Sequence, residues 1–173
     1  MNKNLMDNMH ELIYEVIRNS IEEAKAGFCT EVQVTLLPNQ EVDIKDNGRG
    51  IPLVHGSDHN EEVLENILAG HPITCLEYAQ MGDLPMENLR VVNSLCEHLT
   101  VKVYRDGKCF TQDYVRGIAQ HEIICSETDN EHGTEIILKP DTQIFGEMAF
   151  SIEMINSWIA AQAIPASLLI RLM

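Results

Sequence analysis

Apolar residues recur at intervals of three and four between residues 5 and 26, which predicts an amphipathic helix over that stretch. Gly27 follows directly and ends the periodic run, as glycine commonly does after a helix. The positions that share one face, and that we expect to point into a core, are Leu5, Met9, Leu12, Ile13, Val16, Ser20 and Ala24.

Two short runs after this helix alternate between apolar and polar residues, a pattern typical of half-buried strands. The first covers residues 31–36 and the second covers residues 41–44, with a turn at Pro38-Asn39-Gln40 between them. The sequence therefore predicts a β-hairpin that ends at Asp46.

The middle of the chain has a weaker pattern. Residues 61–69 favour a helix, and residues 70–85 carry turn-forming residues with little periodicity, which indicates a loop. Residues 86–97 again favour a helix, and Pro85 suits its first turn because a proline there removes no helical hydrogen bond.

The second half is richer in strands. Residues 99–104 and 109–116 flank Asp106-Gly107, a pair that strongly favours a tight hairpin turn. Residues 126–132 are expected to form a polar loop. Further strands are expected at residues 121–126, 133–139 and 167–172, and a helix at residues 150–161.

These elements predict an α+β fold for a single domain spanning residues 1–173. We expect a two-layer sandwich, with a mixed but mostly antiparallel sheet and helices on one face. The chain has no repeat, low-complexity tract or linker, and its 173 residues suffice for one core.

Composition narrows the function. No stretch is long and apolar enough for a membrane span, and the N-terminus lacks a secretory pattern. Five scattered cysteines without a Cys-x-x-Cys pair favour free thiols in the cytoplasm over a zinc site or a disulfide framework. The net charge of −15, from 27 acidic and 12 basic residues, argues against direct DNA binding.

Candidate chemistry begins on the first helix, where Glu15, Asn19, Glu22 and Glu23 share a polar face. A carboxylate there can polarise a water molecule, and a carboxamide oxygen one turn later can ligate Mg²⁺. The alternative is a solvated face on which Arg18 pairs with Glu15 or Glu22.

Two later segments add polar groups at strand ends. Asp46 opens an Asp-Asn-Gly-Arg-Gly run, in which glycines allow the backbone to approach a flat ligand and the carboxylate can accept the amine of adenine. Gly133-Thr134 opens a late strand, and its hydroxyl can hold a water molecule or donate to a ring nitrogen. The alternatives are an ordinary tight turn and an ordinary strand start.

The order and spacing of these pieces resemble the GHKL (Bergerat) ATPase superfamily, which includes gyrase B, MutL, heat-shock chaperones and histidine kinases. The likeness is closer to the gyrase and topoisomerase IV B branch and covers roughly residues 9–172. The segments that carry it are Tyr14–Gly27, Asp46–Pro52, Val91–Leu95, Val103–Lys108 and Gly133–Thr134.

The resemblance implies a role for each matching residue. Glu15 would be the general base that activates the attacking water, and Asn19 would ligate Mg²⁺. Asp46 would bind the adenine amine, helped by a water molecule held with Thr134. The cofactors implied are ATP and Mg²⁺.

Other positions would complete that site. Arg49 and Pro52 would flank the base, and Gly50 would let the backbone come close to the nucleotide. Glu23 would pair with Arg49, and Arg105 would lie near the pocket mouth. The apolar walls would be Val16, Ile44, Ile51 and Ile136.

The chain also departs from the family pattern. Arg18 stands where this branch usually has Asp. The glycine-rich lid is replaced across residues 80–90, where Pro85 lacks an N–H and Asp83 and Glu87 would compete with a phosphate. We also expect the N-terminal dimerising arm and the second domain to be absent, as in an excised domain or a short homologue.

The leading hypothesis is therefore the ATP-binding domain of a type II topoisomerase of gyrase B type, with weak hydrolysis in isolation. In the full-length context, nucleotide binding would drive dimer closure with a second B-type chain and DNA strand passage by an A-type DNA-cleaving chain. The alternative is a degenerate, non-hydrolysing nucleotide-binding module with a regulatory or interaction role.

Overall fold

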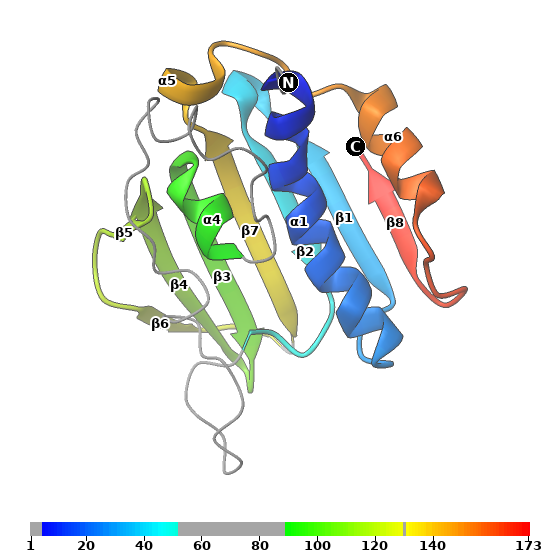
Figure 1. Ribbon diagram of the computed structural model, residues 1–173. Coiled ribbons are helices and arrows are strands. Elements are labelled where there is room, and N and C mark those ends of the chain that lie inside the picture. The colour runs from blue at the N-terminus through cyan, green and yellow to red at the C-terminus, as the bar shows by residue number, and fades with distance from the viewer. Residues whose placement is uncertain (1–4, 52–88, 130) are drawn as a thin grey trace.

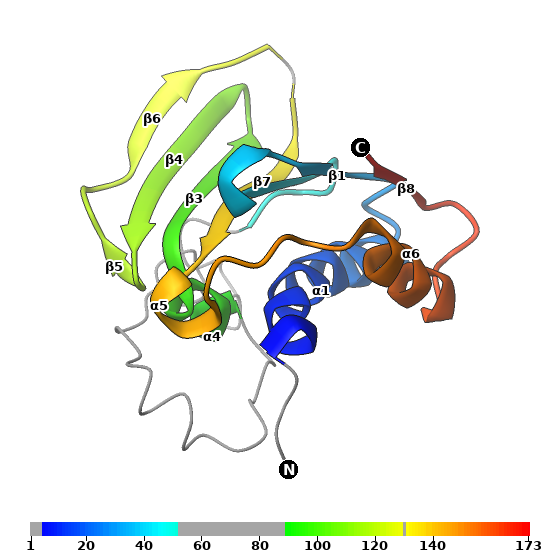
Figure 2. The ribbon, with the colours of Figure 1, turned by 90° about the horizontal axis from the view of Figure 1, so that it is seen from above.

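The computed structural model describes residues 5–51, 89–129 and 131–173, and arranges them as helices on one face of a single sheet (Figures 1 and 2). The helix expected at residues 61–69, the loop expected at residues 70–85 and the substituted lid up to Asn88 lie outside the described residues, as does Pro52. None of the described helices combines the length and apolar character needed to cross a bilayer.

The sheet runs in the order β5-β4-β3-β7-β2-β1-β8, and β6 pairs with β4 beside this path. Among the described strands only the β1–β8 pair is parallel, so the expected mixed, mostly antiparallel sheet is confirmed. The strands are β1 (Glu31–Leu36), β2 (Val42–Asp46), β3 (Cys96–Arg105), β4 (Lys108–Val115), β5 (Ile118–Ala119), β6 (Ile124–Glu127), β7 (Gly133–Pro140) and β8 (Leu169–Leu172).

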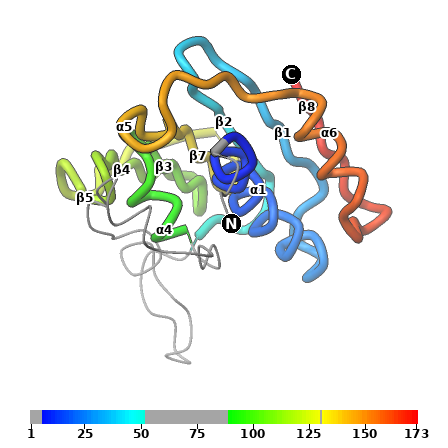
Figure 3. Tube along the Cα trace, turned by 45° about the horizontal axis from the view of Figure 1, so that its top comes forward, coloured from blue at the N-terminus to red at the C-terminus, as the bar shows by residue number. Residues whose placement is uncertain are grey.

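Helix α1 is the long central helix on the covered face, with α4 and α5 to one side of it and α6 to the other (Figures 1 and 3). Its apolar stripe is buried, as the three-and-four spacing predicts, and packs on the alternating apolar positions of the strands below. The helices are α1 (Leu5–Lys25), α4 (Leu89–Ser94), α5 (Thr142–Phe145) and α6 (Ile152–Ala161), with a short 3₁₀ turn η1 (Pro38–Gln40).

Strand β7 occupies the middle of the sheet although it comes late in the chain (Figure 1). It pairs with β2 on one side and with β3 on the other, both antiparallel. Its buried residues Ile136 and Leu138 face the helices together with Ile44 of β2 and Val101 of β3. The start of β7 therefore meets the end of β2 at one edge of the core.

Both predicted hairpins form. Val34 lies opposite Ile44 in the β1–β2 pair, and the β3–β4 turn has positive φ at Asp106 (56°) and Gly107 (72°). This is the backbone that an Asp-Gly pair favours, because it matches the twist of the flanking strands.

One expected boundary is wrong. The helix predicted over residues 86–97 ends at Ser94, and Cys96 already belongs to β3, opposite Pro140 of β7. Helical spacing extends through Cys96, but pairing with the central strand takes precedence there and is accompanied by an irregularity between Cys96 and His98.

Short elements differ from the sequence prediction as well. Strand β5 and helix α5 have too few residues to give a periodic signal; α5 begins where the Asp141 side chain accepts a hydrogen bond from the Gln143 N–H. The strand expected at residues 121–126 lies at Ile124–Glu127, so the polar loop expected at 126–132 begins later.

Candidate functional site

Asp46 is the last residue of β2 and points to the covered face of the sheet. The strand alternates, so Val42, Ile44 and Asp46 are buried while Asp43 and Lys45 face the other way. A buried carboxylate at the end of an apolar row must find hydrogen-bond donors, because an unpaired charge in this position would be very costly.

Three donors reach this carboxylate. The Ser20 hydroxyl of α1 donates to Oδ2 at 2.7 Å, and the Gly48 and Thr134 N–H groups donate to Oδ1 at 2.9 and 3.1 Å. A carboxylate offers about four acceptor positions. The described residues therefore use three of them and leave one on Oδ2, which is a place for a donor from a ligand.

The charge on Asp46 is held at a cost. Burial raises the pKa of Asp46, and the hydrogen bonds from Gly48, Ser20 and Thr134 lower it only in part, so the pKa stays above its usual value. A carboxylate that remains charged in such a place is a strong acceptor for an additional N–H donor.

Thr134 joins the start of β7 to the loop after β2. Its Oγ1 accepts a hydrogen bond from the Ile51 N–H at 3.2 Å, which leaves the hydroxyl proton available for a second partner. The site therefore presents an acceptor at Asp46 and a donor at Thr134, joined directly by the Thr134 N–H.

Two glycines permit this close approach of loop and strand. Gly133 has φ +131°, and a Cβ there would overlap the backbone carbonyl oxygen of Asp46. Gly50 has φ +81°, and its Cβ would lie 2.9 Å from Val103 Cγ1. Neither position can take a side chain without moving the backbone around the carboxylate.

Arg49 folds back onto the C-terminal part of α1. Its Nη2 lies 2.8 Å from Glu23 Oε1 and its Nε lies 3.2 Å from Oε2, while its guanidinium stacks over the Phe28 ring at 3.8 Å. Hydrogen bonds from Arg49 outweigh burial and hold the pKa of Glu23 below its usual value. The expected Glu23–Arg49 ion pair is present.

Glu15 and Asn19 lie one turn apart on α1. The Glu15 side chain is only 12% exposed, and its Oε2 accepts a hydrogen bond from Arg18 Nη1 at 2.9 Å. Asn19 is exposed. Of the alternatives for this face, the Arg18–Glu15 pair is confirmed, whereas Glu22 pairs with Lys25.

Known proteins can now be compared with this geometry. The B chain of DNA gyrase from Thermotoga maritima is 40% identical over 154 residues, which cover 86% of the chain and 24% of the relative. The B chain of DNA topoisomerase 4 from Rickettsia bellii is 38% identical over 148 residues, 82% of the chain and 22% of the relative. The chain belongs to the gyrase B and topoisomerase IV B family. No protein-family model matches it.

Solved structures agree with this family. The 43K ATPase domain of Thermus thermophilus gyrase B, in complex with an aminocoumarin, superposes with a TM-score of 0.69 at 29% identity and covers 86% of the chain and 38% of that structure. The topoisomerase IV ATP-binding domain of Francisella tularensis gives a TM-score of 0.76 over 94% of the chain and 80% of that structure; at 23% identity it supports the fold alone. The expected fold is confirmed, and the chain spans about a quarter of the length of its curated relatives.

Not every residue assigned from the family resemblance reaches the Asp46 cluster. Arg105 ends β3 at the same edge of the sheet, because Val103 lies opposite Thr134, but its ion-pair partner is Asp106 at 4.0 Å. The expected apolar walls are all buried members of the central core: Val16, Ile44, Ile51 and Ile136.

Two supporting residues are not evident from the sequence pattern. Ser20 falls within the apolar stripe of α1, although its hydroxyl makes the shortest hydrogen bond to Asp46. A serine in an otherwise apolar stripe is the available signal, since a buried hydroxyl needs a partner. Phe28 follows the glycine that ends α1, and no periodic pattern connects it with Arg49.

A second hollow near Asp46 lies on the opposite face of the sheet. Its volume is about 320 Å³, and its lining is polar and charged: Glu31, Gln33, Lys45, Asp46, Asn47, Glu131 and His132. A flat base needs apolar surfaces above and below it. The helix-facing side, where Ile44, Ile51 and Thr134 gather, fits a purine better than this polar hollow does.

Proposed function

We propose that this chain is one ATP-binding domain of a type II topoisomerase of gyrase B type, which binds Mg-ATP and hydrolyses it weakly on its own. The observation that carries the proposal is the buried Asp46 carboxylate, held by three donors with one acceptor position left over. Family membership supports it, because a structure named as the ATPase domain of gyrase B matches most of the chain.

The donor and acceptor pattern selects adenine over guanine. Adenine carries an amine donor beside a ring-nitrogen acceptor, which complements the Asp46 carboxylate and the Thr134 hydroxyl. Guanine places a carbonyl oxygen at the position of that amine, and two acceptors facing each other in a buried site repel. Ile51 and the aliphatic part of Arg49 would flank the ring, as would Pro52, which lies outside the described residues.

Glu15 and Asn19 would serve the phosphate end. Both lie on α1 one turn apart, on the helix that also supplies Ser20 to Asp46. Glu15 would accept a proton from the attacking water, and its low exposure limits competition from bulk solvent. Asn19 presents a hard carboxamide oxygen, which fits Mg²⁺, an ion usually held by few protein ligands plus phosphates. The bound ion would neutralise phosphate charge.

In a longer protein, nucleotide binding would drive closure onto a second B-type chain and DNA strand passage with an A-type DNA-cleaving chain. The domain itself would not grip DNA, because its net charge of −15 repels phosphates.

A second candidate function is a non-hydrolysing nucleotide-binding module with a regulatory role. The observation that favours it is the Arg18–Glu15 ion pair, which engages the proposed base. In that case the adenine half of the site would work while the catalytic half would not.

Calorimetric titration separates these functions. ATP, ADP, adenosine and guanosine would each be titrated into the full chain, with and without Mg²⁺. Tight ATP binding that depends on Mg²⁺ supports the ATPase domain. Equal and weak binding of adenosine and ATP supports the second candidate. Binding of guanosine as tight as that of adenosine, or no binding of any of the four, would refute the assignment of Asp46.

A further inference from the structure

Arg18 connects two carboxylates on the exposed side of α1. Its Nη1 lies 2.9 Å from Glu15 Oε2 and 3.2 Å from Glu11 Oε2, and its Nη2 also donates to Glu11 at 3.2 Å. Burial lowers the pKa of the Arg18 guanidinium, but the two carboxylates more than offset this and leave it above its usual value. The cation is therefore held between two anions.

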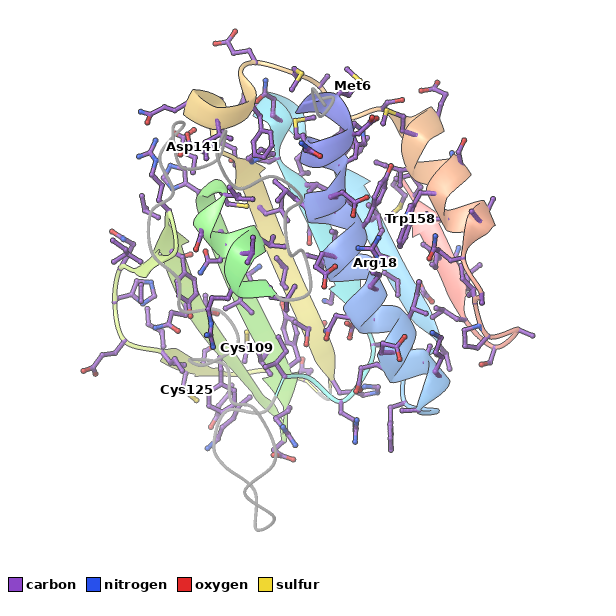
Figure 4. The ribbon with its side chains drawn as sticks, viewed as in Figure 1. Met6, Arg18, Cys109, Cys125, Asp141 and Trp158 are labelled. Carbon is purple, nitrogen blue, oxygen red and sulfur yellow. The ribbon has the colours of Figure 1, made fainter. Side chains whose placement is uncertain are left out.

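An aromatic stack from another helix fixes the guanidinium in place. Arg18 lies over the Trp158 ring of α6 at 5.3 Å, and Trp158 stacks on Tyr14 of α1 with centroids 4.5 Å apart and planes 3° from parallel. Figure 4 shows Arg18 and Trp158 side by side between α1 and α6. The side chain thus has an ionic and an aromatic anchor, which restrict it more than a solvent-exposed ion pair would.

This placement affects what Glu15 can do. A general base works better as its affinity for a proton increases, and a neighbouring cation reduces that affinity. The hydrogen bond from Arg18 also occupies one of the two Glu15 oxygens. Removing the cation would leave Glu11 as a like charge one turn away, which increases the affinity of Glu15 for a proton.

We propose that Arg18 is a positioning residue that restrains Glu15 as a base, so that the Arg18–Glu15 pair limits nucleotide hydrolysis by this chain. The inference rests on the proposed function, because it needs Glu15 to serve as the base. It goes further by assigning slow turnover to one ion pair and its aromatic anchor on α6.

Arg18→Gln is the main test, because glutamine keeps helix propensity and polarity but removes the charge. We expect kcat for ATP to rise about three- to tenfold with KM unchanged. Arg18→Lys keeps the charge and should stay near wild type. Lys25→Ala is the matched control: it removes an ion pair of the same spacing on the same helix, to Glu22, and should change neither constant.

The chain contains one tryptophan, so fluorescence reports on the anchor directly. Emission from Trp158 should shift in Arg18→Gln, shift in the same direction in Glu15→Gln, and stay unchanged in Lys25→Ala. Identical emission in Arg18→Gln and wild type would contradict the aromatic anchor.

The outcomes separate this inference from the proposed function. Normal ATP binding with unaltered turnover in Arg18→Gln overturns the restraint alone. A fall in kcat that Arg18→Lys restores also overturns it, because Arg18 would then hold Glu15 in its productive position. Failure of the wild type to bind any adenine nucleotide overturns the proposed function and this inference together.

Discussion

Replacing Asp46 with asparagine should weaken nucleotide binding without weakening the fold. The substitution keeps the shape of the side chain and an oxygen that can accept from the Gly48 and Thr134 N–H groups. The other oxygen becomes an amide NH₂, and the Ser20 hydroxyl can rotate to accept from it. The amide also turns an N–H toward the place where an adenine amine would donate.

The size of the binding loss follows from the single acceptor position that remains on Asp46 Oδ2. A hydrogen bond to a charged group contributes about 1.5–3 kcal/mol. We therefore expect the Kd for adenosine to rise about 10- to 150-fold in Asp46→Asn.

Stability should move in the other direction. Burial raises the pKa of Asp46 more than its hydrogen bonds lower it. A carboxyl whose pKa is raised on folding stabilises the folded state below its unfolded pKa, about 3.9 for Asp, and this contribution is lost as the pH rises through the folded pKa. At pH 7 the charge counts against the folded state, so the free energy of unfolding of Asp46→Asn should equal or exceed that of wild type.

Asp43→Asn is a matched control on the same strand. Its carboxyl faces the opposite side of the sheet, and its pKa is also raised, first by burial and then by Glu135. It should show the same direction of stability change at pH 7 and no change in the Kd for adenosine.

Urea unfolding at pH 4 and pH 7, followed by far-ultraviolet circular dichroism, measures the stability of both variants, and calorimetry measures adenosine binding. The reasoning fails if Asp46→Asn binds adenosine as tightly as wild type. It also fails if Asp46→Asn loses more than about 2 kcal/mol of stability at pH 7, since burial of the charge would then not dominate.

Two further predictions concern the same sheet. Gly133→Ala should destabilise the fold by about 3 kcal/mol or more, because φ is +131° and the new Cβ would overlap the last carbonyl oxygen of β2; Gly107→Ala, at φ +72° with nothing within 4 Å, should cost only about 1 kcal/mol, as urea unfolding would show. Lys102→Met should cost about 1–2 kcal/mol above pH 4.5 and less below it. Burial raises the pKa of Glu135, but hydrogen bonds from Lys102 and Tyr104 outweigh this and lower it, so the stabilisation is present above the unfolded pKa and is lost as the pH falls; a pH-independent cost would contradict that.

Much of the fold could be predicted from the sequence, because most of its elements have a clear periodicity. The 21-residue helix α1 and the strand β1 have regular apolar spacing, and Asp106-Gly107 specifies its turn by backbone preference alone. Elements whose limits depend on partners were harder. Cys96 suits a helix by spacing, and only its pairing with β7 places it in a strand.

The candidate site shows the same division. The position of Asp46 at a strand end and its closeness to Thr134 could be predicted, since motif order along the chain constrains both. The third donor could not, because the contact between Ser20 and Asp46 joins residues 26 positions apart and depends on how α1 lies across the sheet. The sequence leaves the alternatives for Arg18 open, and the structure shows that it pairs with Glu15 and also with Glu11.

The central place of β7 has a consequence for how the domain opens. This strand joins the β1–β2–β8 group to the β3–β4–β5–β6 group, and its first residues complete the Asp46 cluster. Partial opening at either outer edge leaves the cluster intact, whereas losing it requires separating the two groups. Backbone amides such as that of Thr134 should therefore exchange their hydrogens only through global unfolding, and a bound nucleotide should slow that exchange across the whole sheet.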